Sequence, residues 1–79
     1  MANIETYNQI FFDVLGVKED ELSNLTYQGT ELWDSVGHMA LIAAIEDAFD
    51  IMMETDDIIN FSSYKKGIDI LKDNYGIKL

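Results

Sequence analysis

The sequence predicts an all-α fold: a four-helix bundle with three longer helices, one short third helix and a long loop between helices one and two. Apolar side chains recur at steps of three and four residues in three separate stretches. Residues that commonly begin or end helices stand at the borders of those stretches. The chain has no proline and no alternating apolar and polar run, so nothing favours strands. Its 79 residues are enough for one small domain, residues 1–79.

The first predicted helix spans residues 4–15. Its apolar side chains share one face at helical spacing, namely Ile4, Tyr7, Phe11, Val14 and Leu15. Asn3 is a suitable N-cap, and Gly16 is a suitable residue to end the helix.

Residues 17–33 show no sustained helical period and are predicted to form a loop. A loop of this length in so small a domain is expected to be functional or to pack apolar side chains of its own. The side chains available for that packing are Leu22, Leu25, Tyr27, Leu32 and Trp33.

The second predicted helix spans residues 35–49 and has two different faces. One face is a core stripe of Leu41, Ile42, Ile45 and Phe49. The opposite face is apolar in its first half and acidic in its second half, with Val36, Met39, Ala40, Ala43, Glu46, Asp47 and Asp50. An apolar patch with a charged rim is typical of a partner-docking surface, to which Asp34 would belong. Alternatively, the alanines and the methionine are there only as good helix formers.

The third and fourth predicted helices complete the bundle. Thr55 is expected to cap the short third helix, with Asp56 and Asp57 favourably placed at its start. We interpret these acidic residues as a solvated helix start and not as a metal site, because the spacing and glycine of a calcium loop are missing. Ser62 or Ser63 is expected to cap the fourth helix, which ends at Gly76 and has the core stripe Tyr64, Ile68, Leu71 and Tyr75.

Charge and composition narrow the functional classes. Fifteen acidic residues against five lysines give a net charge of −10, which predicts no binding to nucleic acid and favours partners with basic surfaces. No apolar stretch approaches membrane-spanning length and no leader pattern opens the sequence, so we expect no membrane insertion and a cytoplasmic monomer. The chain lacks cysteine, so any thiol chemistry must come from an added group.

Asp34 and Ser35 stand at the start of the second predicted helix. Either residue is explained by capping alone. However, backbone N–H groups and the positive end of the helix dipole converge here, so a phosphodiester attached to Ser35 would be electrostatically favoured. Nothing near Ser35 in the sequence completes a catalytic triad, so we expect an attachment point and not an activated nucleophile.

The run DSVGHMALIAAIEDAF, residues 34–49, resembles the signature of the acyl carrier proteins, in which an Asp-Ser-Leu triplet opens helix two. The order of the predicted helices resembles that family over the whole chain. The resemblance implies a fold of acyl-carrier type and a 4'-phosphopantetheine arm added to Ser35 by a phosphopantetheinyl transferase. It also implies a non-catalytic carrier that holds an acyl or aminoacyl group as a thioester. Its partners would be a loading ligase and enzymes of the ketosynthase or acyltransferase type.

Some residues differ from the usual pattern of this family, and these differences bear on which biosynthetic pathway such a carrier would serve. Val36 replaces the usual leucine, and Gly37 and Ala40 stand where carriers of fatty-acid synthesis usually have acidic residues. The Trp-Asp-Ser-Val-Gly-His-Met run is more similar to stand-alone carriers of specialised pathways that make polyketide, peptide or surface-glycan products. The alternatives are a housekeeping fatty-acid-synthesis carrier and an unmodified acidic helical adaptor.

Two expectations concern the surroundings of an arm on Ser35. His38, the only histidine, is expected to be a satisfied residue at the core edge; alternatively, it hydrogen-bonds the phosphate of the arm or contacts the cargo. Ala43, Ala44 and Ala48 leave space along the second helix. Of these, Ala44 and Ala48 flank the core stripe and could line a cargo cavity beside Ile45.

Overall fold

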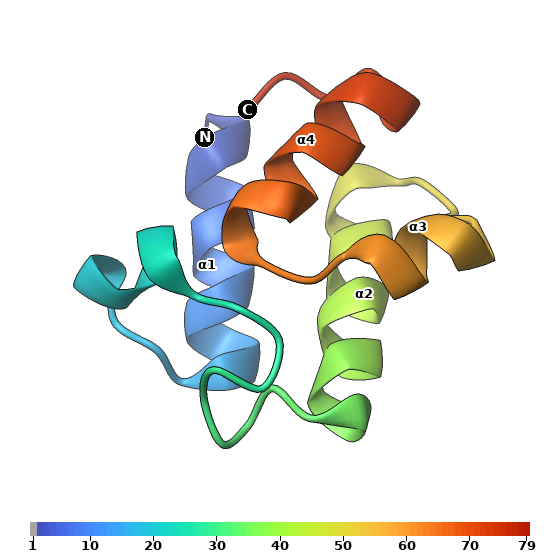
Figure 1. Ribbon diagram of the computed structural model, residues 1–79. Coiled ribbons are helices and arrows are strands. Elements are labelled where there is room, and N and C mark those ends of the chain that lie inside the picture. Colours follow the sequence, from blue (N-terminus) through green and yellow to red (C-terminus); the bar gives the residue numbers. More distant parts are fainter. Residues whose placement is uncertain (1) are drawn as a thin grey trace.

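The computed structural model describes residues 2–79 and confirms the all-helical prediction. The elements follow the order α1 (Asn3–Leu15), the short 3₁₀ helix η1 (Glu19–Asn24), α2 (Ser35–Phe49), α3 (Thr55–Asn60) and α4 (Tyr64–Tyr75). α1 and α2 pack side by side and run in opposite directions, while α3 lies at one side of the molecule (Figure 1). Across the described residues there is no strand, only a single bridge between Thr26 and Ser63.

One hydrophobic core draws on every part of the fold, although α3 has no fully buried residue and contributes only the half-buried Ile58. Its centre is aromatic: the Phe11 ring meets Tyr7 and Trp33 edge-on, at centroid distances of 4.9 Å and 5.7 Å. Phe61, from the connection between α3 and α4, stacks on Phe11 at 6.5 Å. The largest fully buried side chains are Trp33, Tyr7, Phe11, Phe61, Leu15, Leu41, Ile42, Ile45 and Leu71.

Several of the predicted helix boundaries are confirmed. Gly16 and Gly76 end α1 and α4 in the left-handed conformation, with φ of 65° and 67°, which glycine adopts without steric cost. Ser63 caps α4, where its hydroxyl accepts a hydrogen bond from Lys66 N at 2.9 Å. Asp34 caps α2.

Two predicted caps are wrong. Ala2 takes the N-cap position of α1, because its carbonyl accepts hydrogen bonds from Glu5 N and Thr6 N. Asn3 is the first helical residue, and its side-chain amide donates to Lys78 O at 2.9 Å and so links the two ends of the chain. Thr55 is likewise the first residue of α3, and Glu54 takes its N-cap position.

Residues 17–33 form a loop as predicted, except that Glu19–Asn24 within it form the 3₁₀ helix η1. A 3₁₀ turn has three residues per turn and no 3.6-residue stripe, so helical periodicity could not reveal it. Leu22, Leu25 and Trp33 are buried as expected, whereas Tyr27 and Leu32 are exposed. The loop is pinned to the α3–α4 connection by the bonds Tyr27 N to Ser62 O, 2.8 Å, and Tyr64 N to Leu25 O, 3.0 Å.

Predicted core stripes are confirmed in their centres. In α2, Leu41, Ile42 and Ile45 are buried and Phe49 is half-buried. In α4, Leu71 is buried and Tyr64, Ile68 and Tyr75 are half-buried. The buried set also includes members that the stripes did not name, Ile10 in α1 and Gly67 and Ile70 in α4.

The buried Tyr7 hydroxyl should make the unfolding free energy depend on pH in the alkaline range. Burial, with a smaller contribution from the charge of Tyr64, raises the pKa of Tyr7 well above its ordinary value of 10.0. The unfolded chain therefore ionises Tyr7 at a pH where the folded chain does not. The stabilisation is fully present below about pH 10 and is lost as the pH rises further, at up to about 1.4 kcal/mol per pH unit.

We expect the unfolding free energy of the wild type to fall more steeply above pH 10 than that of Tyr7→Phe. Urea titrations followed by circular dichroism across this pH range measure both slopes. The phenylalanine variant also lacks the hydrogen bond from the Tyr7 hydroxyl to Tyr64 O, 2.8 Å. Its unfolding free energy should therefore be about 1 kcal/mol lower than that of the wild type below pH 10. Equal slopes for the two proteins would contradict the assignment.

Candidate functional site

Ser35 is the first residue of α2, and its side chain is exposed. Asp34 organises this helix start, because its carboxylate oxygen Oδ1 accepts a hydrogen bond from Gly37 N at 2.8 Å. The Asp34 carbonyl accepts a second bond, from His38 N, at 2.8 Å. Together these contacts hold the first turn, so the Ser35 hydroxyl projects from a rigid element and not from a mobile loop.

Gly37 has a steric reason to be glycine. A Cβ atom at this position would collide with the backbone carbonyl of Leu32. The segment that enters α2 therefore folds directly against the first turn of the helix. Close backbone approach of this kind tolerates only glycine.

A mostly apolar pocket of about 360 Å³ opens beside Ser35, between the start of α2 and α3. α2 contributes three of its residues, α3 contributes two, and the segments pinned together by the Thr26–Ser63 bridge contribute the rest. The lining residues are Tyr27, Ser35, His38, Met39, Ile58, Ile59, Phe61 and Ser62.

Sequence reasoning identified three of these residues as site residues, Ser35, His38 and Met39. It missed the five that come from the loop and from α3 and its exit, because nothing in their local pattern shows which helix they face. The adjacent apolar residues Ile58 and Ile59, in a short helix that begins with acidic residues, were a weak signal for an apolar face.

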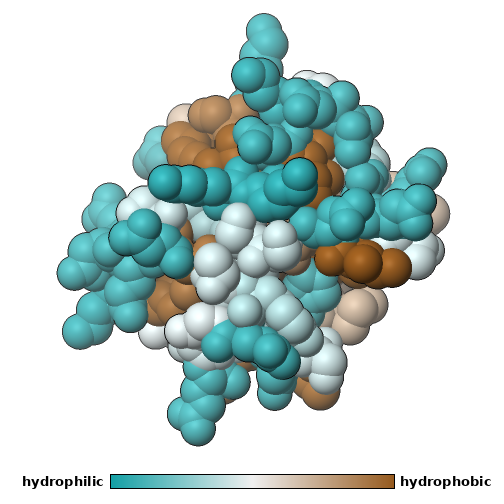
Figure 2. Space-filling model, in the orientation of Figure 1, coloured by the Kyte–Doolittle hydropathy of each residue, from teal (hydrophilic) through white to brown (hydrophobic). Residues whose placement is uncertain are grey.

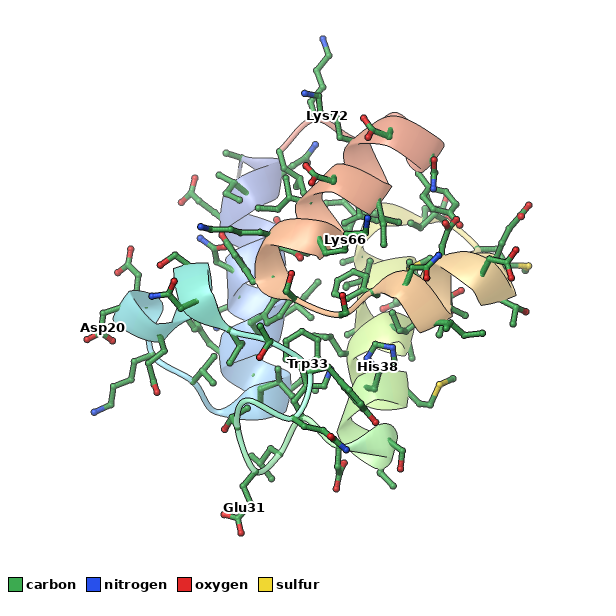
Figure 3. The ribbon with its side chains drawn as sticks, viewed as in Figure 1. Asp20, Glu31, Trp33, His38, Lys66 and Lys72 are labelled. Atoms are coloured by element: carbon green, nitrogen blue, oxygen red, sulfur yellow. The ribbon has the colours of Figure 1, made fainter. Side chains whose placement is uncertain are left out.

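His38 joins three parts of the fold through hydrogen bonds. Its Nδ1 accepts from the indole Nε1 of Trp33 at 2.9 Å, and an indole N–H can only donate. The neutral ring therefore carries its hydrogen on Nε2, which donates to the Ile58 carbonyl at 2.8 Å. Figure 3 shows Trp33 and His38 side by side between the α2 start and α3.

The expectation that His38 is a satisfied residue at the core edge is therefore confirmed. The alternative, a hydrogen bond from His38 to the phosphate of an arm, does not fit, because both ring nitrogens are already occupied. Contact between the ring and a cargo is still compatible with its place in the pocket wall. The same occupancy means that His38 cannot serve Ser35 as a general base without breaking one of these bonds.

The predicted cavity beside Ile45 is wrong. Ala44 is half-buried and packs against the core, whereas Ala48 and Ala43 are exposed. Two of the three small residues therefore face solvent, and the third packs against the core. Two other pockets lie near the other end of α2 and are more polar. One is lined by residues 52–56, and the other by Glu54, Asp56, Asp57, Asp73, Asn74 and Tyr75. A 15-residue helix separates that end from Ser35 by about 20 Å.

The proposed docking face of α2 is largely exposed. Val36 and Met39 have 77% and 55% of their surface accessible, and Ile59 of α3 adds a third apolar side chain with 70%. Ala40, Ala43, Asp34, Asp47 and Asp50 are exposed as well. In Figure 2, one brown hydrophobic area is exposed on the right, where α3 lies, and other brown areas are visible on the left of the molecule.

Glu46 differs from the other predicted docking residues. It is half-buried, and its carboxylate oxygen Oε2 accepts a hydrogen bond from Met53 N at 2.8 Å. Glu46 therefore supports the turn between α2 and α3, and its charge is only partly available to a partner. Asp50 ends α2 with a left-handed φ of 54°.

Acidic and basic side chains are unevenly distributed along the chain. Residues 34–60 hold seven acidic side chains and no lysine, the acidic ones being Asp34, Glu46, Asp47, Asp50, Glu54, Asp56 and Asp57. Four of the five lysines follow residue 64, and Figure 3 shows Lys66 and Lys72 on α4, with Lys72 pointing away from Trp33 and His38. Apart from Asp34, these acidic side chains lie in the second half of α2 and around α3, so the negative charge is concentrated toward the end of α2 away from Ser35.

Two kinds of site do not occur in the part of the chain that the structure describes. Residues 2–79 hold no group of three or more acidic, histidine or cysteine side chains arranged to bind a metal ion. None of the helices described here has the length and apolar character needed to cross a membrane. Comparison of the chain with protein-family models, with curated proteins and with solved structures gave no match.

Proposed function

We propose that this chain is a carrier protein whose Ser35 receives a 4'-phosphopantetheine arm and which presents a thioester-bound acyl or aminoacyl group to partner enzymes. The observation that supports this most is an exposed serine hydroxyl at a rigid helix start, beside an apolar pocket and without a catalytic partner. A hydroxyl in this setting suits covalent attachment, because its surroundings neither activate it nor bury it.

The attachment chemistry belongs to a phosphopantetheinyl transferase. The Ser35 oxygen forms a bond to the phosphorus that carries the pantetheine part of coenzyme A, the adenosine bisphosphate part leaves, and the serine proton passes to a base of that enzyme. The new phosphodiester sits at the positive end of the α2 dipole. The terminal thiol of the arm supplies the sulfur that the cysteine-free chain lacks.

Partner recognition is assigned to the exposed face of α2. Val36, Met39, Ala40 and Ala43 offer an apolar contact surface, and Asp34, Asp47 and Asp50 offer charge to basic patches. The partners proposed are a loading ligase and enzymes of the ketosynthase or acyltransferase type. The proposed place of action is the cytoplasm. A specialised pathway is favoured over housekeeping fatty-acid synthesis, because Gly37 and Ala40 leave the first turns of α2 without acidic side chains.

The carrier function predicts a mass gain that depends on one hydroxyl. After incubation with coenzyme A and a broad-specificity transferase, the intact mass of the wild type should rise by one phosphopantetheine. Ser35→Ala should show no gain. Ser62→Ala is the matched control, because Ser62 lies on the same pocket and is also exposed, and it should be modified like the wild type.

An unmodified adaptor is the second candidate. The exposed apolar side chains of α2 and α3, framed by acidic residues, could dock a basic partner without any arm. Failure of several different transferases to modify a correctly folded wild type would favour this function over the carrier.

A further inference from the structure

The inner end of the pocket beside Ser35 is closed. His38 forms one side of the closure, and its Nε2–H donates to the Ile58 carbonyl at 2.8 Å, which ties α2 to α3 across the inner end of the pocket. Phe61 forms the other side, and only 1% of its surface is accessible. The pocket is therefore a recess that opens at the surface and does not continue as a channel between the helices.

Behind this closure the bundle is full. The Trp33 indole lies edge to edge with the His38 ring, with centroids 6.2 Å apart and planes 16° from parallel, as the hydrogen bond between them requires, and it meets Phe61 at 6.4 Å. Phe61 in turn contacts the buried rings of Tyr7 and Phe11. Trp33, Tyr7 and Phe11 have no accessible surface at all. Aromatic side chains thus occupy the volume that a long alkyl chain would need.

On the basis of the carrier function proposed above, we infer that the recess receives the cargo itself and accepts only short, compact apolar acyl groups. His38 and Phe61 set the length limit. The recess suits such a group because Ile58, Ile59, Met39 and the Tyr27 ring line it. Its volume of about 360 Å³ lies at the lower end of the range of about 300–1,000 Å³ found for small-molecule pockets.

A longer chain would have to break the His38–Ile58 hydrogen bond and displace the Phe61 ring. It would leave an imidazole N–H and a carbonyl without partners in an apolar setting, which is unfavourable. Methylenes beyond the first few therefore stay in solvent.

The test loads the protein with acyl groups of increasing length. Acetyl, butanoyl, hexanoyl, decanoyl and palmitoyl pantetheine arms are transferred to Ser35 from the corresponding acyl-coenzyme A, and intact mass confirms each product. The midpoint of thermal unfolding is then compared with that of the protein with an unacylated arm. We expect a rise of up to about 3–6 °C for each methylene that becomes buried, and no further rise from hexanoyl to decanoyl or palmitoyl.

Two variants should move this limit and one should not. Phe61→Leu replaces the ring that closes the recess with a smaller apolar side chain. In this variant we expect the unfolding midpoint to keep rising with acyl length as far as decanoyl. His38→Asn places an amide oxygen where Nδ1 accepted from Trp33 but does not reach Ile58, so it should also extend the limit. His38→Gln is the matched control, because it can keep a donor near Ile58 while it gives up the Trp33 bond. Each variant is compared with its own unacylated form, which removes its baseline stability.

Three results would overturn the inference. Stabilisation that keeps rising to palmitoyl in the wild type would show that the interior opens to long chains. No dependence on acyl length, together with a large effect of the bare arm, would show that the recess binds the dimethyl part of the arm and not the cargo. Identical limits in the wild type, Phe61→Leu and His38→Asn would show that these residues do not set the length. Failure of the carrier function appears differently, as the absence of any mass gain on Ser35.

Discussion

Replacing Trp33 with alanine should cost about 3–5 kcal/mol of unfolding free energy, which is a large part of the stability expected for a domain of this size. The side chain is completely buried, and it contacts Phe11 at 5.7 Å, Phe61 at 6.4 Å and His38 at 6.2 Å between ring centroids. A chain of 79 residues has about 4–12 kcal/mol in total by the usual value per residue. We therefore expect Trp33→Ala to lose about a quarter or more of the total stability, and to be partly unfolded at room temperature if that total is near the lower value.

Trp33→Phe separates the loss of packing from the loss of the hydrogen bond. Phenylalanine fills much of the same volume but leaves His38 Nδ1 without its donor, which should cost about 1–3 kcal/mol. Urea unfolding followed by far-ultraviolet circular dichroism measures both variants, because the only tryptophan, and with it the fluorescence signal, is lost. A Trp33→Ala protein within about 1 kcal/mol of the wild type would contradict its place at the centre of the core.

Gly67→Ala should destabilise the domain by about 1–3 kcal/mol or more, although the same change usually stabilises a helix. Helix propensity alone predicts a gain of about 1 kcal/mol when alanine replaces glycine in a helix interior. Gly67 is buried in α4, however, and a Cβ atom there would collide with the Tyr7 hydroxyl and the Phe61 ring. Both neighbours are buried and cannot move aside freely. Overpacking therefore outweighs propensity.

A double-mutant cycle tests the mechanism of this prediction. Tyr7→Phe removes the hydroxyl that a Cβ at position 67 would meet, so the alanine should cost less in that background than in the wild type. We expect a coupling of at least about 0.5 kcal/mol in urea unfolding experiments. A stabilising effect of Gly67→Ala in the wild type would show that α4 does not pack closely against α1 at this point.

The helices could be predicted because their signals are local. Each long helix buries one stripe of side chains, and such a stripe leaves a period of 3.6 residues in the sequence. Gly16, Gly76 and Asp34 mark boundaries because left-handed φ angles and first-turn caps favour particular residue types. Asn3 and Thr55 failed as caps because several residues near a helix start can satisfy the same backbone groups, and contacts with Lys78 and Tyr75 elsewhere in the fold determine the register.

The candidate site was predictable only in part. Ser35 and the exposed α2 face follow from the helix start and from the side of the helix opposite the core stripe. The pocket does not, because Tyr27, Ile58 and Ser62 reach it through the hydrogen bonds that pin residues 25–27 to residues 62–64. Pairings between segments so far apart in the chain leave no periodic trace. The place of the cavity depends on which large side chains fill the interior, and the small residues of α2 were a misleading guide to it.

Ser35 can therefore be identified from the local sequence, since a hydroxyl at a helix start needs only its neighbours to be exposed and held. The acidic character of the chain and the order of its four main helices can likewise be predicted from the sequence. The room available beside Ser35 depends instead on His38, which satisfies Trp33 with one nitrogen and Ile58 with the other. That arrangement exists only when the loop, α2 and α3 pack together, because the three partners are brought within hydrogen-bonding distance by burial of the common core.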